Sequence, residues 1–224
     1  MPIIRPHLLA VATLVALAAP GCGSDDHGSA AKPTRTAAHE HYTKDDLKRF
    51  AIRSADLPAG YKKTESRSWS AERCLQSANS EHAALTSRFK AWGIEGCTGV
   101  TYRRKTHDDE RYVDVASGAF AFRDPSSAAQ ALPVIRKALI NSGQTSGDIR
   151  IISRHSIAVS GLGDETARGA RTRMRVLGES ASWFFYFWRT RNVVVFVFTS
   201  DFLGDLDEQS TLEIAKRIDY RGAH

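Results

Sequence analysis

The chain is 224 residues long, which suffices for one domain with a sizeable hydrophobic core. Its formal net charge of +6 is spread along the sequence and does not form one basic block. Such an excess suits a location beside anionic lipid or wall polymer, and we expect no nucleic-acid partner.

The first 21 residues have the layout of a signal peptide. Met1–His7 carries a positive charge at Arg5, and the run Leu8–Ala19 contains no charged residue. About twenty apolar residues are needed to cross a membrane, so this run is too short to be a transmembrane helix. We therefore expect residues 1–21 to be removed.

A cysteine follows the apolar run directly. Ala19, Pro20 and Gly21 lead to Cys22, and the segment resembles the lipobox of bacterial lipoproteins, departing from it at Pro20 and in having Ala19 where Leu is preferred. The resemblance implies acylation of Cys22, with palmitate among the attached chains, and anchoring of a lipoprotein on the outer face of the cell membrane. The alternative is an ordinary secretory signal cut near Ala18 or Ala19, which leaves Cys22 as a free thiol.

The segment after Cys22 is small and polar up to about Tyr42. It offers almost no large apolar side chain to offset the entropy of ordering, so we interpret residues 22–42 as a flexible tether and residues 43–224 as a single domain. The two remaining cysteines, Cys74 and Cys97, would then form a disulfide in a compartment that permits one. Two buried free cysteines are the alternative.

The first half of the domain combines helices with a hairpin. An amphipathic pattern predicts a helix at about residues 43–54, and a strand or extended piece follows at 62–68. A longer helix is expected at 70–92, a hairpin with strands at 97–104 and 112–122, and a third helix at 124–143. Pro133 lies inside this third helix and should kink or divide it.

The second half is mainly strands. We expect strands at 150–159, 168–177, 182–189 and 192–200, and a final helix at 205–218. The strands at 182–189 and 192–200 are apolar on both faces and should lie at the centre of the sheet. The sequence thus predicts an α+β fold, with an antiparallel sheet of about five to six strands and helices packed on one face. The other face needs a second cover, such as sheet curvature, a loop or a ligand.

Three short motifs resemble one known family. They are Leu57-Pro58-Ala59-Gly60-Tyr61, Gly161-Leu162-Gly163-Asp164-Glu165, and Arg189-Thr190-Arg191-Asn192 before a valine run. They are similar to motifs of the actinobacterial PknH-like extracellular sensor domains, which have Gly where this chain has Arg191 and a second disulfide that it cannot form. The resemblance implies a small mixed domain with a ligand-binding groove of unknown ligand, and it supplies no catalytic residue.

The motif search indicates no enzyme and no cofactor. Gly161-x-Gly163 lacks the third glycine of a dinucleotide site and is better read as a turn, and Walker, zinc-protease and serine-hydrolase motifs are absent from the sequence. His39-Glu40-His41 could hold a soft metal and His107–Glu110 a hard cation, but the first lies in the tether and the second in a polar turn. We expect no metal site and no catalytic residue.

Two groups of side chains are candidates for ligand binding. Arg171, Arg173 and Arg175 share one face of a strand and could pair with phosphate or carboxylate, although arginines on a solvent face would look the same. Trp183 and Phe185 could line a pocket for a lipid or aromatic ligand, although core packing alone explains most such aromatic side chains.

We therefore expect a membrane-anchored, extracytoplasmic binding or sensor-like lipoprotein of the cell envelope, with a small molecule or lipid as ligand. The alternative is a protein-interaction module of an envelope complex.

Overall fold

The computed structural model describes residues 41–79, 83–105, 112–142, 149–164, 167–176, 179–201 and 206–224. The proposed signal peptide, Cys22, most of the tether and the turn at His107–Glu110 lie outside this part. Its helices are the 3-10 helices η1 (Lys44–Phe50) and η2 (Ser54–Asp56), and α1 (Ala71–Asn79), α2 (Ala83–Ala91), α3 (Pro125–Ser142) and α4 (Glu208–Ala223). Its strands are β1 (Lys62–Ser70), β2 (Ile94–Lys105), β3 (Tyr112–Phe122), β4 (Ile149–Ala158), β5 (Arg168–Val176), β6 (Glu179–Thr190) and β7 (Val193–Asp201).

The strands form one antiparallel sheet in the order β1-β2-β3-β7-β6-β5-β4. The α+β class is confirmed, but the sheet has seven strands and not five to six. The additional strand is β1, which the sequence predicts only as a strand or extended piece. It is a polar strand with exposed and half-buried positions, and it lies at the edge of the sheet beside β2. The two doubly apolar strands, β6 and β7, lie near the middle of the sheet, as expected.

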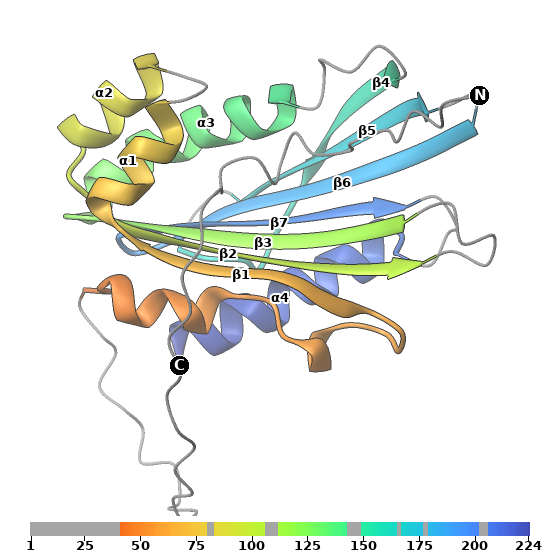
Figure 1. Ribbon diagram of the computed structural model, residues 1–224, viewed down its shortest axis with the longest axis horizontal. Coiled ribbons are helices and arrows are strands. Elements are labelled where there is room, and N and C mark those ends of the chain that lie inside the picture. The colour runs from red at the N-terminus through yellow and green to blue at the C-terminus, as the bar shows by residue number, and fades with distance from the viewer. Residues whose placement is uncertain are drawn as a thin grey trace, which may run out of the picture.

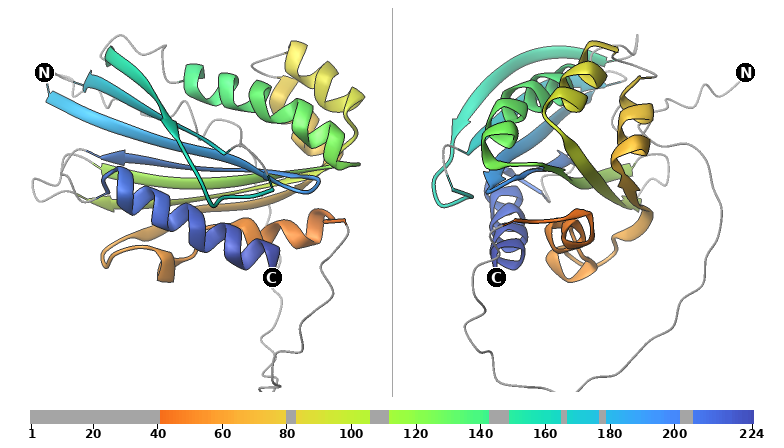
Figure 2. Two further views of the ribbon diagram at one scale, coloured as in Figure 1. Left: turned by 180° about the vertical axis from the view of Figure 1, so that it is seen from behind. Right: turned by 90° about the vertical axis from the view of Figure 1, so that its left-hand side faces the viewer.

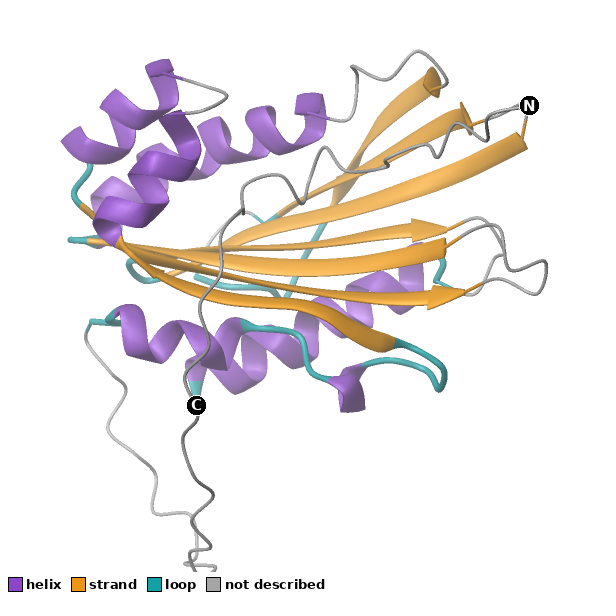
Figure 3. Cartoon of the chain, viewed as in Figure 1, coloured by secondary structure: helices purple, strands orange, loops and turns teal. Residues whose placement is uncertain are grey.

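Helices cover both faces of the sheet, so the expectation of helices on one face was wrong (Figures 1 and 3). One face carries α1, α2 and α3, and the other carries η1 and α4. Side chains of β6 alternate between the two cores: Phe184, Tyr186 and Trp188 face α4, whereas Trp183, Phe185 and Phe187 face α3. The second cover that the apolar strands require is therefore supplied by η1 and α4.

The helices differ from the predicted ones mainly at their ends and breaks. The helix expected at 43–54 is the 3-10 helix η1, and η2 begins at Ser54. The helix expected at 70–92 is two helices, α1 and α2, and it starts one residue later because β1 includes Ser70. The third helix is one element in spite of Pro133. That proline lies on the exposed side of α3, where water can satisfy the carbonyl group that loses its backbone partner.

The helix α4 lies close against η1. A side chain at Gly222 would place its Cβ 2.1 Å from the Phe50 ring, so glycine is required there for this approach. Arg221 adds a paired contact to the same region, because its guanidinium donates to both carboxylate oxygens of Asp56 at 3.1 and 3.0 Å. The amino and carboxyl ends of the domain are thus joined beneath the sheet.

The expected disulfide is present. Cys74 of α1 and Cys97 of β2 are bonded, with their Cα atoms 6.1 Å apart, and both are buried. The bond holds the α1–α2 layer against the sheet. Within the described ranges, no helix is long and apolar enough to cross a membrane.

Candidate functional site

The strand β5 sends alternate side chains to opposite faces of the sheet. Residues that pair across an antiparallel ladder share a face. Arg171 pairs with Phe184, which belongs to the α4-side core, whereas Thr172 pairs with Trp183, which belongs to the α3-side core. The five predicted ligand-binding residues are therefore divided: Arg171, Arg173 and Arg175 lie on the α4 side, and Trp183 and Phe185 lie on the α3 side.

On the α3 side, two buried polar groups lack a partner. The Trp183 side chain is 5% exposed and Thr172 is 2% exposed. Neither the Trp183 indole nitrogen nor the Thr172 hydroxyl has a hydrogen-bond partner among the described residues. Because they occupy directly opposed positions on β5 and β6, both groups lie within one small region. A buried donor without an acceptor costs about 1–3 kcal/mol, so such a pair requires a physical reason.

The surroundings of this pair are apolar and aromatic. The Trp183 ring makes edge contacts with Phe198 at 5.4 Å and with Phe185 at 6.3 Å between centroids. Phe185 also packs on Phe198 at 4.8 Å, and Met174 is fully buried in the same core. A hydrogen-bond acceptor on an otherwise apolar molecule would find two donors here and few competing groups.

On the α4 side of β6, by contrast, the buried aromatic polar groups have hydrogen-bond partners. The Trp188 indole nitrogen donates to the Asp219 carboxylate at 2.9 Å, and the Thr190 hydroxyl donates to the same oxygen at 2.8 Å. The Tyr186 hydroxyl donates to the Glu208 carbonyl oxygen at 3.0 Å, and burial raises the pKa of Tyr186 well above its usual value. These aromatic polar groups are therefore satisfied.

Arg171, Arg173 and Arg175 form a stripe along the α4 side of β5, next to the edge strand β4. Arg173 and Arg175 are exposed, and Arg171 is half-buried with its guanidinium carbon 5.9 Å from the centre of the Phe184 ring. The Nε atom of Arg171 is buried and without a hydrogen-bond partner in the described part of the chain. On β4, Arg150 is exposed and pairs with Arg175, which extends the stripe to a fourth arginine.

Sequence reasoning missed two residues of these regions, Thr172 and Arg150. The sequence did indicate the face on which Thr172 lies, since the alternation of β5 places it on the side opposite the arginines. Arg150 carried none, because its position depends on a β-bulge between Ile151 and Ser153 that shifts the register of β4 against β5.

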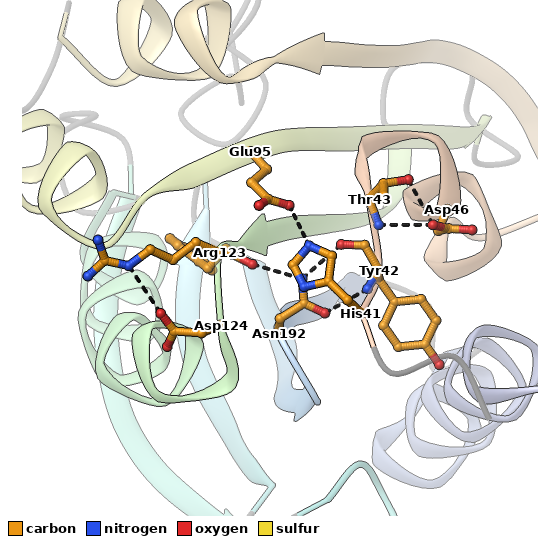
Figure 4. Close-up of polar contacts among 9 residues, drawn as sticks. His41, Tyr42, Thr43, Asp46, Glu95, Arg123, Asp124 and Asn192 are labelled. Atoms are coloured by element: carbon orange, nitrogen blue, oxygen red, sulfur yellow. Dashed lines mark hydrogen bonds and ion pairs between the residues drawn. The ribbon is translucent and has the colours of Figure 1, made fainter.

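Figure 4 shows how the start of the domain is fixed. Asn192 is fully buried: its side-chain oxygen accepts from the Tyr42 amide at 2.9 Å, and its amide nitrogen donates to the carbonyl oxygens of Tyr42 and Phe122, each at 2.8 Å. Tyr42 is 1% exposed, so the folded part includes this residue, which was assigned to the tether. His41 bonds Glu95 at 2.9 Å, while His39 and Glu40 lie outside the described residues.

Two ion pairs of the described residues join neighbouring parts of the fold. Asp164 accepts from the Arg191 amide and from the Arg189 guanidinium, which joins the Gly161–Asp164 turn to the β6–β7 hairpin. Arg103 forms a two-point pair with Asp114 at 2.6 and 3.2 Å between the neighbouring strands β2 and β3. In the described ranges no group of three or more His, Cys, Asp or Glu residues is placed to hold a metal ion.

No known family model matches the sequence, and no curated protein matches it either. Among solved structures, the crystal structure of the extracellular domain of PknH from Mycobacterium tuberculosis is similar, with a TM-score of 0.55 and 11% sequence identity. The match covers 83% of this chain and 100% of that chain. At this identity the likeness shows a shared fold, which confirms the fold implied by the sequence resemblance.

Proposed function

We propose that the protein is an exported lipoprotein, anchored through Cys22 to the outer face of the cytoplasmic membrane, whose domain binds a ligand as a sensor-like module and not as an enzyme. Three observations support this. The leader has a signal-peptide layout that ends at a lipobox-like cysteine. Cys74 and Cys97 form a disulfide, a bond typical of oxidising compartments. The fold is shared with an extracellular domain.

The pair of unsatisfied donors at Trp183 and Thr172 carries the ligand-binding part of the proposal. Both groups are buried in the core that α3 covers, next to Phe185, Phe198 and Met174. The ligand class that fits is an apolar molecule with one acceptor oxygen, such as the carbonyl of an ester or an acid. An indole N–H can only donate, so the ligand must supply the acceptor.

Native mass spectrometry of the protein purified from its own membrane tests the ligand. We expect a retained small molecule of low polarity. Its affinity should fall about tenfold in Trp183→Phe and in Thr172→Val, and the retained fraction with it, because one hydrogen bond of about 1.4 kcal/mol is lost in each. Trp92→Phe, in the same layer, is the matched control and should retain it.

Two outcomes would count against ligand binding. Absence of any retained molecule, or equal loss in Trp92→Phe, would remove the assigned role of the donor pair. A stoichiometric protein in place of a small molecule would favour the alternative, a protein-interaction module of an envelope complex.

The anchor has a separate test. Radiolabelled palmitate should enter the wild-type chain and not Cys22→Ser, and globomycin should cause the unprocessed, acylated precursor to accumulate. Processing that is indifferent to globomycin would instead indicate an ordinary secretory signal.

A further inference from the structure

We propose that Arg150, Arg171, Arg173 and Arg175 form a docking surface for the anionic headgroups of a lipid bilayer. We call these four residues the arginine face. The choice of a membrane as the occupant rests on the proposed anchor at Cys22, which would hold the domain beside such a surface.

The register places the four side chains on one side of the sheet. Arg150 pairs with Arg175, and Arg171 pairs with Phe184 of the α4-side core. Residues two apart on a strand are about 6.8 Å apart, and neighbouring strands are about 4.8 Å apart. The guanidinium groups therefore extend over a patch on the order of 14 Å long, large enough to contact several headgroups.

The helix that covers this side of the sheet lies over other strands. Helix α4 packs on β6 and β7, with the Tyr186 hydroxyl bonded to Glu208 at its first turn. Figure 2 (left) shows β4 and β5 diverging from α4 towards one end of the sheet. Arg150, Arg173 and Arg175 are accordingly exposed to solvent.

The charges of the arginine face are not balanced locally. None of its four guanidinium groups forms a hydrogen bond or an ion pair with any residue that the structure describes; that of Arg171 has only the contact with the Phe184 ring. Arg150 and Arg175 are directly opposed, an arrangement of like charges that destabilises a sheet.

Phosphate is the anion that suits this arrangement. A guanidinium presents two parallel N–H donors that match two phosphate oxygens. Ser153 and Ser182 pair with Arg173 from the two neighbouring strands and add hydroxyl donors on the same side. Arg171 is held against an aromatic ring, which reduces the entropy that it loses on binding.

The proposed anchor favours a bilayer over a soluble anion, because a basic patch held beside a membrane is attracted to its anionic headgroups. The segment from Cys22 to His41 could extend to roughly 65 Å, so an anchored domain could place this end on the membrane.

Vesicle co-sedimentation of the chain from Gly23 to His224, which contains every described residue, tests the inference without the lipid anchor. Vesicles of phosphatidylcholine with 30 mol% phosphatidylglycerol are compared with pure phosphatidylcholine at 0.1 M salt. We expect binding to the anionic vesicles only. The triple variant Arg150→Gln/Arg173→Gln/Arg175→Gln should bind about 100-fold more weakly, since each basic residue near an anionic surface contributes about fivefold.

The control removes the same charge elsewhere. Arg88, Lys90 and Lys137 are exposed on α2 and α3, on the opposite side of the sheet. Their triple replacement by Gln should retain most of the binding, and neither variant should melt below the parent. Equal loss in the two variants, or no preference for anionic vesicles, would overturn the proposal.

A soluble ligand is a distinct outcome. If the chain does not sediment with anionic vesicles and millimolar inorganic phosphate raises its melting temperature at constant ionic strength, the arginine face binds free phosphate and the membrane assignment is wrong. Failure of palmitate labelling would remove the anchor alone, because the sedimented chain lacks Cys22.

Discussion

Replacing either of two buried tryptophans by phenylalanine should change the hydrogen-bond contribution to the free energy of unfolding in opposite directions. Trp183→Phe removes a buried indole N–H that has no partner, whereas Trp188→Phe removes one that donates to Asp219 at 2.9 Å. The rings are comparably buried, at 5% and 0% exposure, although they lie five positions apart on β6 and face opposite sides of the sheet. The loss of ring volume is therefore similar, and the difference between the variants isolates the polar contribution.

The magnitude follows from these two environments. A hydrogen bond to a charged acceptor contributes about 1.5–3 kcal/mol, and an unsatisfied buried donor costs about 1–3 kcal/mol. Trp188→Phe should consequently lower the free energy of unfolding by about 3 kcal/mol more than Trp183→Phe does. For a domain of this size the corresponding difference in melting temperature is about 6–12 °C.

Urea unfolding of ligand-free protein, followed by circular dichroism, measures both variants on one scale. The free energies must be compared at equal m-values, so that the unfolded states are equivalent. Equal destabilisation by the two substitutions would refute the reasoning, because it would mean that the Trp183 nitrogen has a partner of similar strength in the folded protein.

Three further changes test the domain boundaries and turns. Asn192→Ala should lower the free energy of unfolding by about 4 kcal/mol, because it leaves both backbone groups of the buried Tyr42 without partners; chemical denaturation measures it, and a loss under 1 kcal/mol would contradict the assigned role. Arg191→Gly should raise it by about 0.5–1 kcal/mol, since Arg191 has a positive φ of 54° at the first position of a two-residue hairpin loop, where Gly is preferred; a loss of stability would contradict this. Asp207→Ala should cost about 1 kcal/mol at pH 7 by removing the cap of α4. The backbone amide of Ser210 lowers the pKa of Asp207, so the contribution of its charge is complete above about pH 4 and is lost as the pH falls through the folded-state pKa; the gap between variant and parent should shrink in urea titrations at pH 3.

The sequence predicted the local structure of β5 and β6 better than their surroundings. Strict alternation placed Arg171, Arg173 and Arg175 opposite Thr172, and the structure keeps that division. A period of two determines the face of each residue within a strand. It says nothing about which strand lies alongside, so the Thr172 and Trp183 pairing required the structure.

The cover on the second face shows a similar limit. Apolar residues on both sides of β6 and β7 indicated that something must pack on each side, and the structure supplies α4 and η1 there. An amphipathic helix reveals its own apolar side but not the sheet face that it meets. The pairing of β3 with β7, between segments far apart in the chain, likewise leaves no periodic signal in the sequence.

The two proposed surfaces must be separable, because they use alternate residues of one strand. Thr172 points to the α3-side core and Arg173, its neighbour, to the opposite side. The triple arginine variant should therefore retain the small molecule seen by native mass spectrometry, and Trp183→Phe should sediment with anionic vesicles as the parent does. If either variant lost both properties while its melting temperature fell, the cause would be damage to β5 as a whole. If both were lost at an unchanged melting temperature, the two faces would be coupled, and assigning them independent binding roles would be wrong.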